Sequence, residues 1–275
     1  MQTIIHSSSR MGGLICLIKV NRIDKPKELT KEVQQQLTDE FKKDKNKNVW
    51  NKKYIRDQLI LECNSKCVYC ECFIGNGHKE MHIDHFHYKN KYKDEVVTWE
   101  NLNPSCSTCN KNKSQHDTYE TPIINPFEQE PKDYFYLKNY RYYSRNEKVD
   151  KIVHDTINVL GLNDTENIVK LRFEQGETLI DKINDIYELA EENKEILNNN
   201  ISKKNRVMRG CKNILRKGIK EAEYSAFMAT IIKNDENYIK LKQLLIRLKI
   251  WNEELQSLDE QVEKIKMQIY PDRLY

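Results

Sequence analysis

The most regular hydrophobic pattern of the chain lies near its C-terminus. Apolar residues recur there in alternating steps of three and four, at Leu241, Leu244, Leu248, Trp251, Leu255, Leu258, Val262, Ile265 and Ile269. This spacing predicts an apolar seam of about four heptads along a helix. Two arrangements satisfy it: an antiparallel helical hairpin packed within the same chain, or a seam to another chain in a homodimer or larger assembly.

Other helices are predicted upstream of this seam. From about Val149 onward the pattern is typical of helix, with Gly161 as a helix C-cap and residues 163–166 as a capping box before the next helix. This stretch, 126–275, is predicted to be a helical region that binds a partner protein.

The N-terminal part, 1–60, is predicted to be a strand and helix segment. Residues 18–22 read as a short strand, and the charged stretch 27–60 reads as mostly helical with Thr30 as a candidate N-cap. The apolar run 12–20 is predicted to be a buried strand, because it is too short to span a bilayer and lacks a small-residue cleavage site. We therefore expect a cytoplasmic protein.

Composition narrows the class of protein. Charged residues make up 32% of the chain, and 8 glycines and 6 prolines are few for 275 residues, which argues against a disordered or all-β chain. The formal net charge is only +4, so a basic surface for nucleic acid must be local.

Six of the eight cysteines lie between Cys63 and Cys109. Four of them form two C-x-x-C pairs, at Cys67, Cys70, Cys106 and Cys109. Each pair can direct two sulfurs at one point, so the two pairs predict a closed, structural zinc site. Cys63 and Cys72 are competing ligands but belong to no such pair, and Cys16 and Cys211 are predicted to be buried thiols.

A second set of residues suits phosphodiester hydrolysis. Asp84 and His85 lie between the two cysteine pairs, and Asn110 follows the second pair. Histidine is suited to take a proton from water near neutral pH, and carboxylate and amide oxygens suit a hard catalytic cation. Candidate substrate contacts are His87, Lys89, Lys111 and Lys113.

The run Cys-x-x-Cys, Ile-Asp-His-Phe, Trp-Glu-Asn-Leu and Ser-Cys-x-x-Cys-Asn-x-x-Lys resembles the HNH endonuclease family with a four-cysteine zinc. This resemblance covers Cys67 to about Asp117. It implies an α+β fold: a small ββα-metal module with a structural zinc, at 61–125, embedded in a mainly α-helical chain. It also implies that Asp84 and Asn110 bind a catalytic Mg²⁺ or Mn²⁺, that His85 is the general base, and that Asn101 orients the base or braces the hairpin loop. The implied products are a 5′-phosphate and a 3′-hydroxyl.

A narrower resemblance covers roughly residues 18 to 190. The phrases Ile-Lys-Val-Asn-Arg-Ile-Asp-Lys-Pro, His-Phe-His-Tyr-Lys, Asn-Pro-Phe and Thr-Ile-Asn-Val-Leu-Gly-Leu-Asn are similar to PtuB, the HNH subunit of Septu-type and retron-linked anti-phage systems. That resemblance implies a PtuA-like ATPase partner. The chain departs from the family at His87 and Tyr88, where Arg and Pro are usual.

Three functions are compatible with these residues. The first is a DNA endonuclease in an anti-phage complex, the second is the same chemistry on RNA such as tRNA, and the third is a non-catalytic zinc module that binds nucleic acid or protein. Preference for DNA rests on the family resemblance, because no residue pattern reads base identity or a 2′-hydroxyl.

Overall fold

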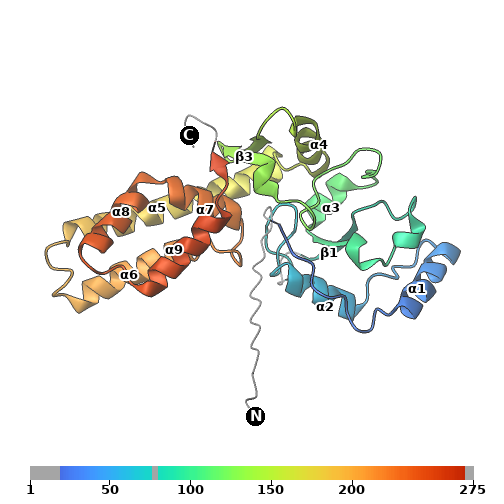
Figure 1. Ribbon diagram of the computed structural model, residues 1–275, viewed down its shortest axis with the longest axis horizontal. Helices are drawn as coiled ribbons and strands as arrows, with labels where there is room; N and C mark the ends of the chain where they lie inside the picture. Colours follow the sequence, from blue (N-terminus) through green and yellow to red (C-terminus); the bar gives the residue numbers. More distant parts are fainter. Residues whose placement is uncertain (1–18, 76–79, 270–275) are drawn as a thin grey trace, which may run out of the picture.

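The structure is a computed structural model and describes residues 19–75 and 80–269. Figure 1 shows an elongated molecule, with a small mixed module at one end and a bundle of helices at the other. The predicted strand at 12–20 lies largely outside the described residues. No described helix is long and apolar enough to cross a membrane.

The mixed module contains a ββα unit. Strand β1 (His82–His85) pairs antiparallel with β2 (Leu102–Ser105), with His82 opposite Ser105 and His85 opposite Leu102. Helix α3 (Ser107–Lys113) follows β2 directly and contacts β1. The α+β fold with this small unit is therefore confirmed.

Two helices precede the ββα unit. Helix α1 (Lys31–Lys43) begins after Thr30, whose side chain accepts a hydrogen bond from the Val33 amide, so the predicted N-cap is confirmed. Helix α2 (Lys53–Glu62) contacts β2. The predicted segment boundary at 60/61 falls inside α2, and the three-segment division stays a prediction.

The strand predicted at 18–22 is wrong over its described part, because residues 19–22 form none. The Val20 amide donates to the carbonyl of Pro126 at 2.7 Å. A proline has no N–H with which to return a second ladder bond, so pairing does not extend there.

A small sheet and a helix connect the two ends of the molecule. Strand β3 (Phe135–Lys138) lies between β4 (Arg141–Ser144), which is antiparallel to it, and β5 (Gln268–Ile269), which is parallel. Helix α4 (Asp150–Leu160) contacts α3 and ends at Gly161, whose φ of 64° confirms the predicted C-cap.

Five helices form the bundle. A π-helical turn (Thr165–Val169), capped by Asp164, leads into α5 (Lys170–Glu192), the longest helix described. Helix α5 packs against α6, α7 and α8, and α9 packs against α6 and α7. The bounds of these four are α6 (Ile201–Leu215), α7 (Ser225–Asn234), α8 (Glu236–Arg247) and α9 (Glu253–Ile265).

The heptad seam is divided between α8 and α9. Its continuity breaks because Lys249 adopts a left-handed φ of 59° and the Asn252 side chain caps α9 by accepting from the Leu255 amide. Leu241, Leu244 and Leu255 are buried within the chain. The seam therefore packs intramolecularly, although α8 and α9 pack mainly on α5, α6 and α7 and less on each other.

Candidate active site

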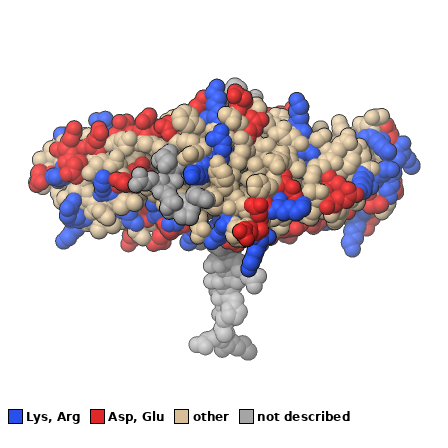
Figure 2. Space-filling view, turned by 90° about the horizontal axis from the view of Figure 1, so that it is seen from above, with Lys and Arg blue, Asp and Glu red and all other residues tan. Residues whose placement is uncertain are grey.

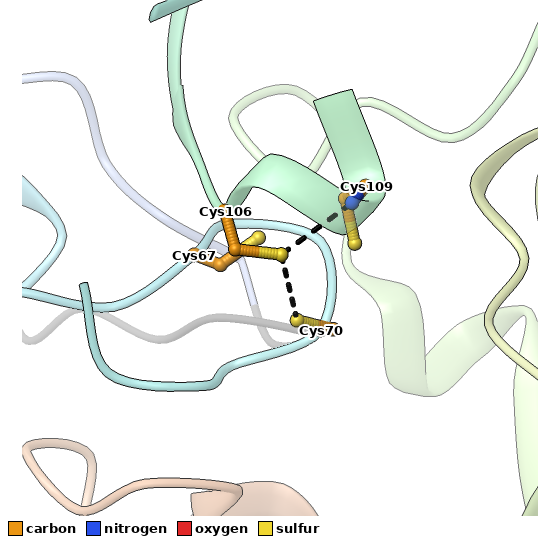
Figure 3. Close-up of side chains that lie close together, drawn as sticks. All are labelled: Cys67, Cys70, Cys106 and Cys109. Atoms are coloured by element: carbon orange, nitrogen blue, oxygen red, sulfur yellow. Dashed lines mark hydrogen bonds between the residues drawn. The ribbon is translucent and has the colours of Figure 1, made fainter. Parts of the chain in front are cut away.

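Four cysteines, two from a loop and two from the start of a helix, meet at one point (Figure 3). Cys67 and Cys70 lie in the loop after α2, while Cys106 caps α3 and Cys109 lies in its first turn. Their sulfur atoms all lie within 4.8 Å of one another, and those of Cys70 and Cys106 are 3.7 Å apart. Sulfurs around a tetrahedral zinc ion at about 2.3 Å would be about 3.8 Å apart. The four thiols can thus hold a structural zinc.

The other described cysteines lie outside this set of four. Burial raises the pKa of the Cys63 and Cys211 thiols to about 12, so both stay protonated at neutral pH, and a protonated thiol is a poor metal ligand. Cys72 is buried close to the cluster but is not one of the four whose sulfurs lie mutually close. Cys16 falls outside the described residues.

His85 is the last residue of β1 and is buried. Its Nε2 lies 2.9 Å from the carbonyl oxygen of Val96. A carbonyl only accepts, so Nε2 carries the proton and Nδ1 of the neutral ring is left as an acceptor. Burial, with smaller effects of Lys89 and Lys113, lowers the pKa of His85 to about 3. The ring is therefore neutral at physiological pH.

Asp84 has both carboxylate oxygens engaged. The Tyr69 hydroxyl donates to Oδ2 at 2.6 Å, and the Lys113 ammonium lies 3.1 Å from Oδ1. Tyr69 stands between the two cysteines of the first pair, so the loop that carries the metal thiolates also holds this carboxylate.

A directed chain of hydrogen bonds stands behind Tyr69. The Arg22 guanidinium, which can only donate, bonds the Asn103 Oδ1 at 2.7 Å. The Asn103 amide nitrogen must then face the Tyr69 oxygen, 3.1 Å away, and the Tyr69 hydroxyl proton is left to point at Asp84. We call Arg22, Asn103 and Tyr69 the relay.

A cleft of about 510 Å³ brings several predicted residues together. Asp84, His85 and Asn110 all line it, and within the described part of the chain the Asn110 side chain has no hydrogen-bond partner. Alternation along a strand would send Asp84 and His85 to opposite faces. They share the cleft because β1 ends at His85.

Asn101 lies outside the cleft and holds the loop between β1 and β2. Its Oδ1 accepts from the His87 amide at 2.6 Å, and its Nδ2 donates to the carbonyls of His87 and Glu95. Glu95 precedes Val96, whose carbonyl orients His85. The Asn101 side chain thus braces the loop that positions the histidine.

Two candidate substrate contacts are placed elsewhere than expected. His87 does not line the cleft: its ring stacks on Tyr119 at 3.8 Å, and its Nδ1 lies 2.7 Å from the Thr118 hydroxyl. Lys113 is buried, and its ammonium also donates to the His85 carbonyl at 2.6 Å. Both side chains therefore have polar atoms bonded within the fold, and a substrate contact by either of them stays a prediction. Lys89 and Lys111 do line the cleft.

The cleft also has a wall that sequence motifs did not indicate. Trp50 and Arg56, which precede the first cysteine pair, line it. The Trp50 ring meets the His85 ring edge-on at 4.7 Å, and the Lys89 ammonium lies 4.7 Å from the Trp50 ring centre. No spacing rule links these residues to Asp84, so only the packing of α2 against the module reveals them.

Comparison with known proteins identifies the family. No family model matches the chain. The chain is 35% identical over 248 residues to the Septu protein PtuB of Bacillus thuringiensis, covering 90% of this chain and 94% of that protein. The chain belongs to the PtuB family. The family resemblance read from the sequence is therefore confirmed, and the alignment covers both the cysteine module and the helical bundle.

Proposed function

We propose that this PtuB-family chain is a metal-dependent HNH endonuclease that hydrolyses phosphodiester bonds of DNA, as the nuclease of a Septu anti-phage system. One observation carries the proposal. A neutral histidine with a free Nδ1, a carboxylate and an unpartnered amide line the same cleft, together with Arg56, Lys89 and Lys111. The reaction has three requirements: an acceptor for the proton of water, oxygen ligands for a metal ion, and cationic side chains that bind the phosphates.

Asp84 and Asn110 would hold a Mg²⁺ or Mn²⁺ ion. The donor types fit, since Asp84 and Asn110 both line the cleft, and the Tyr69 and Lys113 bonds leave further lone pairs on the Asp84 carboxylate. When bound, such an ion neutralises charge on the phosphate and on the leaving oxygen.

His85 would act on the attacking water. Its Nδ1 takes a proton as the water oxygen forms a bond to phosphorus, and the bond from phosphorus to the 3′ oxygen breaks. The 3′ oxygen leaves as a hydroxyl after taking a proton from solvent, and the other product is a 5′-phosphate. Val96 and Trp50 fix the ring during this step, because one accepts from Nε2 and the other packs against its edge.

Arg56, Lys89 and Lys111 would bind the phosphates on either side of the cut. Burial lowers the pKa of Lys89, so an incoming phosphate also recovers part of the cost of holding that charge in a partly dry site. Two acidic residues, Glu80 and Asp84, line the cleft together with these three basic residues.

Cleavage of supercoiled plasmid and of RNA with Mg²⁺ or Mn²⁺ tests the proposal. We expect plasmid cutting, and a loss of at least ~100-fold for His85→Ala with zinc content and a cooperative melt retained. Asn110→Ala, at a side chain that has no hydrogen-bond partner among the described residues, should lose activity without loss of fold. The exposed His154→Ala is the matched control.

Other outcomes of this assay are equally informative. Cutting of RNA alone would refute the DNA substrate and keep the chemistry. No cutting of either nucleic acid, with and without the ATPase, would leave a non-catalytic zinc module.

The helical bundle is the proposed docking region for a PtuA-like ATPase. Ile239 and Ile246 lie one heptad apart on α8 and are 42% and 50% exposed, and exposed apolar side chains favour protein contacts. Ile239→Asp with Ile246→Asp should abolish co-purification with the co-expressed ATPase while intrinsic folding is kept. Unchanged co-purification would exclude this face of α8.

A further inference from the structure

The segment 196–220, which includes α6, has an unusual charge. It contains no Asp or Glu and eight basic residues, at Lys203, Lys204, Arg206, Arg209, Lys212, Arg216, Lys217 and Lys220. Its formal charge of +8 is twice that of the whole chain. Figure 2 shows many acidic side chains on the upper face of the helical end of the molecule, so the excess of positive charge in this segment is not shared by the whole bundle.

The basic residues on the outer side of α6 do not serve the fold. Val207, Cys211 and Ile214 form its buried side. Arg206 and Arg209 in α6, and Arg216 and Lys217 in the turn directly after it, are exposed. The spacing of Arg206, Arg209 and Arg216 along a helical path places these three on the opposite side. We call all four residues the α6 basic face.

Few of these charges are neutralised within the chain. Lys212 and, at 4.0 Å, Arg216 pair with Glu254 of α9, and Lys220 lies 3.6 Å from the carboxylate of Glu221. Arg206, Arg209 and Lys217 have no ion pair or side-chain hydrogen bond to any residue in the ranges 19–75 and 80–269. Helix α5 is rich in Asp and Glu and packs on α6, yet no ion pair joins these two fully described helices.

This charge pattern costs stability. Like charges three or four positions apart destabilise a helix by roughly 0.2–0.5 kcal/mol per pair, and α6 repeats such pairs along its length, as at Arg206 with Arg209. A face that only met solvent would intersperse acids, as α9 does. The arrangement is favourable when a polyanion lies along the face.

The side chains of the α6 basic face suit a nucleic acid better than a protein partner. They are all donors, and Asn205 and Asn213 add amide donors beside two shallow hollows of about 330 and 590 Å³. Asp185 and Glu223 also line the second hollow, as do Phe73 and Ile186. Ile201 at the start of α6 is exposed, but no large apolar side chain between residues 202 and 220 is, so the anchors typical of a protein interface are absent from the part of the helix that carries the basic residues.

We propose that the α6 basic face binds the sugar–phosphate backbone of a nucleic acid, without sequence preference, at a site separate from the cleft. The stretch from Arg206 to Arg216 is about 15 Å long, which spans about four base pairs of a duplex at about 3.4 Å per phosphate. This proposal rests on the proposed function, because the nucleic acid it retains is the substrate.

Binding of a fluorescein-labelled 30-base-pair duplex, followed by fluorescence anisotropy, tests the proposal. The zinc-loaded full chain carries His85→Ala so that the probe is not cut. Arg206→Ala, Arg209→Ala and Arg216→Ala combined should weaken binding at least tenfold at low salt. The slope of log affinity against log salt should fall by about two to three.

A matched control removes three exposed cations from the same bundle: Lys240→Ala, Arg247→Ala and Lys264→Ala. This control should change affinity by less than twofold. Equal affinities of the α6 variant and its parent would overturn the proposal. So would a variant that binds the duplex normally but no longer co-purifies with the ATPase, since the face would then bind protein. Duplex binding through α6, combined with a wild-type chain that cuts neither plasmid nor RNA in the cleavage assay, would refute the nuclease and leave this surface standing.

Discussion

The cysteine module and the helical bundle bury different kinds of side chain. Eleven polar or charged residues are buried between positions 61 and 125, against five among the described residues after 125. The bundle instead buries leucines, isoleucines and alanines along α5 to α9. Buried polar groups cost free energy unless each is hydrogen bonded, so the module needs a source of stability that the bundle does not.

The difference teaches where the specificity of each half resides. In the module, four thiols fix two loops and the relay fixes one carboxylate, so geometry depends on particular atoms. In the bundle, burial of apolar surface is non-directional, and helix ends are set by caps such as Asp235 and Asn252.

The two halves meet at a buried charged contact. The Lys66 ammonium lies 2.9 Å from the Ser225 hydroxyl and 3.3 Å from the Glu71 carboxylate, and Ser225 donates to that carboxylate at 2.6 Å. Lys66 and Glu71 flank the first cysteine pair, and Ser225 begins α7. The loop that carries the first cysteine pair and the bundle are therefore in direct contact.

The largest expected effect is loss of the zinc site. Cys67→Ser or Cys106→Ser removes one of four ligands, and zinc binding contributes on the order of 10 kcal/mol to folding of such modules. We expect insoluble protein, or soluble protein with no bound zinc by elemental analysis and no cooperative melt of the module. Cys63→Ala is the control and should keep one zinc per chain. A well-folded Cys67→Ser protein would show that the module is stable without a zinc ion bound by all four cysteines.

A core truncation in the bundle should have a smaller effect and leave the metal in place. Leu241 is fully buried, and Leu→Ala at such sites costs about 2–5 kcal/mol. We expect Leu241→Ala to lower the urea midpoint while zinc content stays at one per chain. The exposed Ile201→Ala should leave the midpoint unchanged. Zinc loss on mutating Leu241 would mean that the halves fold as one cooperative unit.

Local signals predicted much of the fold. The Thr30 cap, the Gly161 cap and the intramolecular alternative for the heptad seam follow from residues close in sequence. The seam was expected to be continuous because the apolar period runs past Asn252, but α8 ends at Arg247 and the Asn252 side chain caps the start of a separate helix, α9. The strand at 18–22 failed because a strand depends on its partner, and the partner is Pro126.

The candidate site divides in the same way. The cysteine pairs stand in recognisable motifs, and the fold brings the four sulfurs together. Asp84, His85 and Asn110 also stand in such motifs, and the fold brings them to one cleft. The roles of Lys113 and His87 depended on which way a side chain turns, which sequence spacing leaves open. Arg22, Tyr69 and Asn103 come from three distant positions, so no pattern could have joined them before the fold was known.

The smallest expected effect tests whether the relay serves the metal or only the fold. Tyr69→Phe removes one hydroxyl, and losing a hydrogen bond to a metal-binding side chain typically weakens metal affinity by about 10–100-fold. We expect calorimetric titration of the zinc-loaded protein with Mn²⁺ to show a dissociation constant raised at least tenfold. Plasmid cutting should recover at high Mn²⁺, because Asp84 itself is intact.

Tyr238→Phe is the matched control, since Tyr238 is also buried and also donates to a carboxylate, that of Asp259, in the bundle. Both variants should lose about 1 kcal/mol of stability, but only Tyr69→Phe should change Mn²⁺ binding. Equal Mn²⁺ affinities in the two variants would reduce the relay to a structural bond and remove the link from the zinc loop to the catalytic carboxylate.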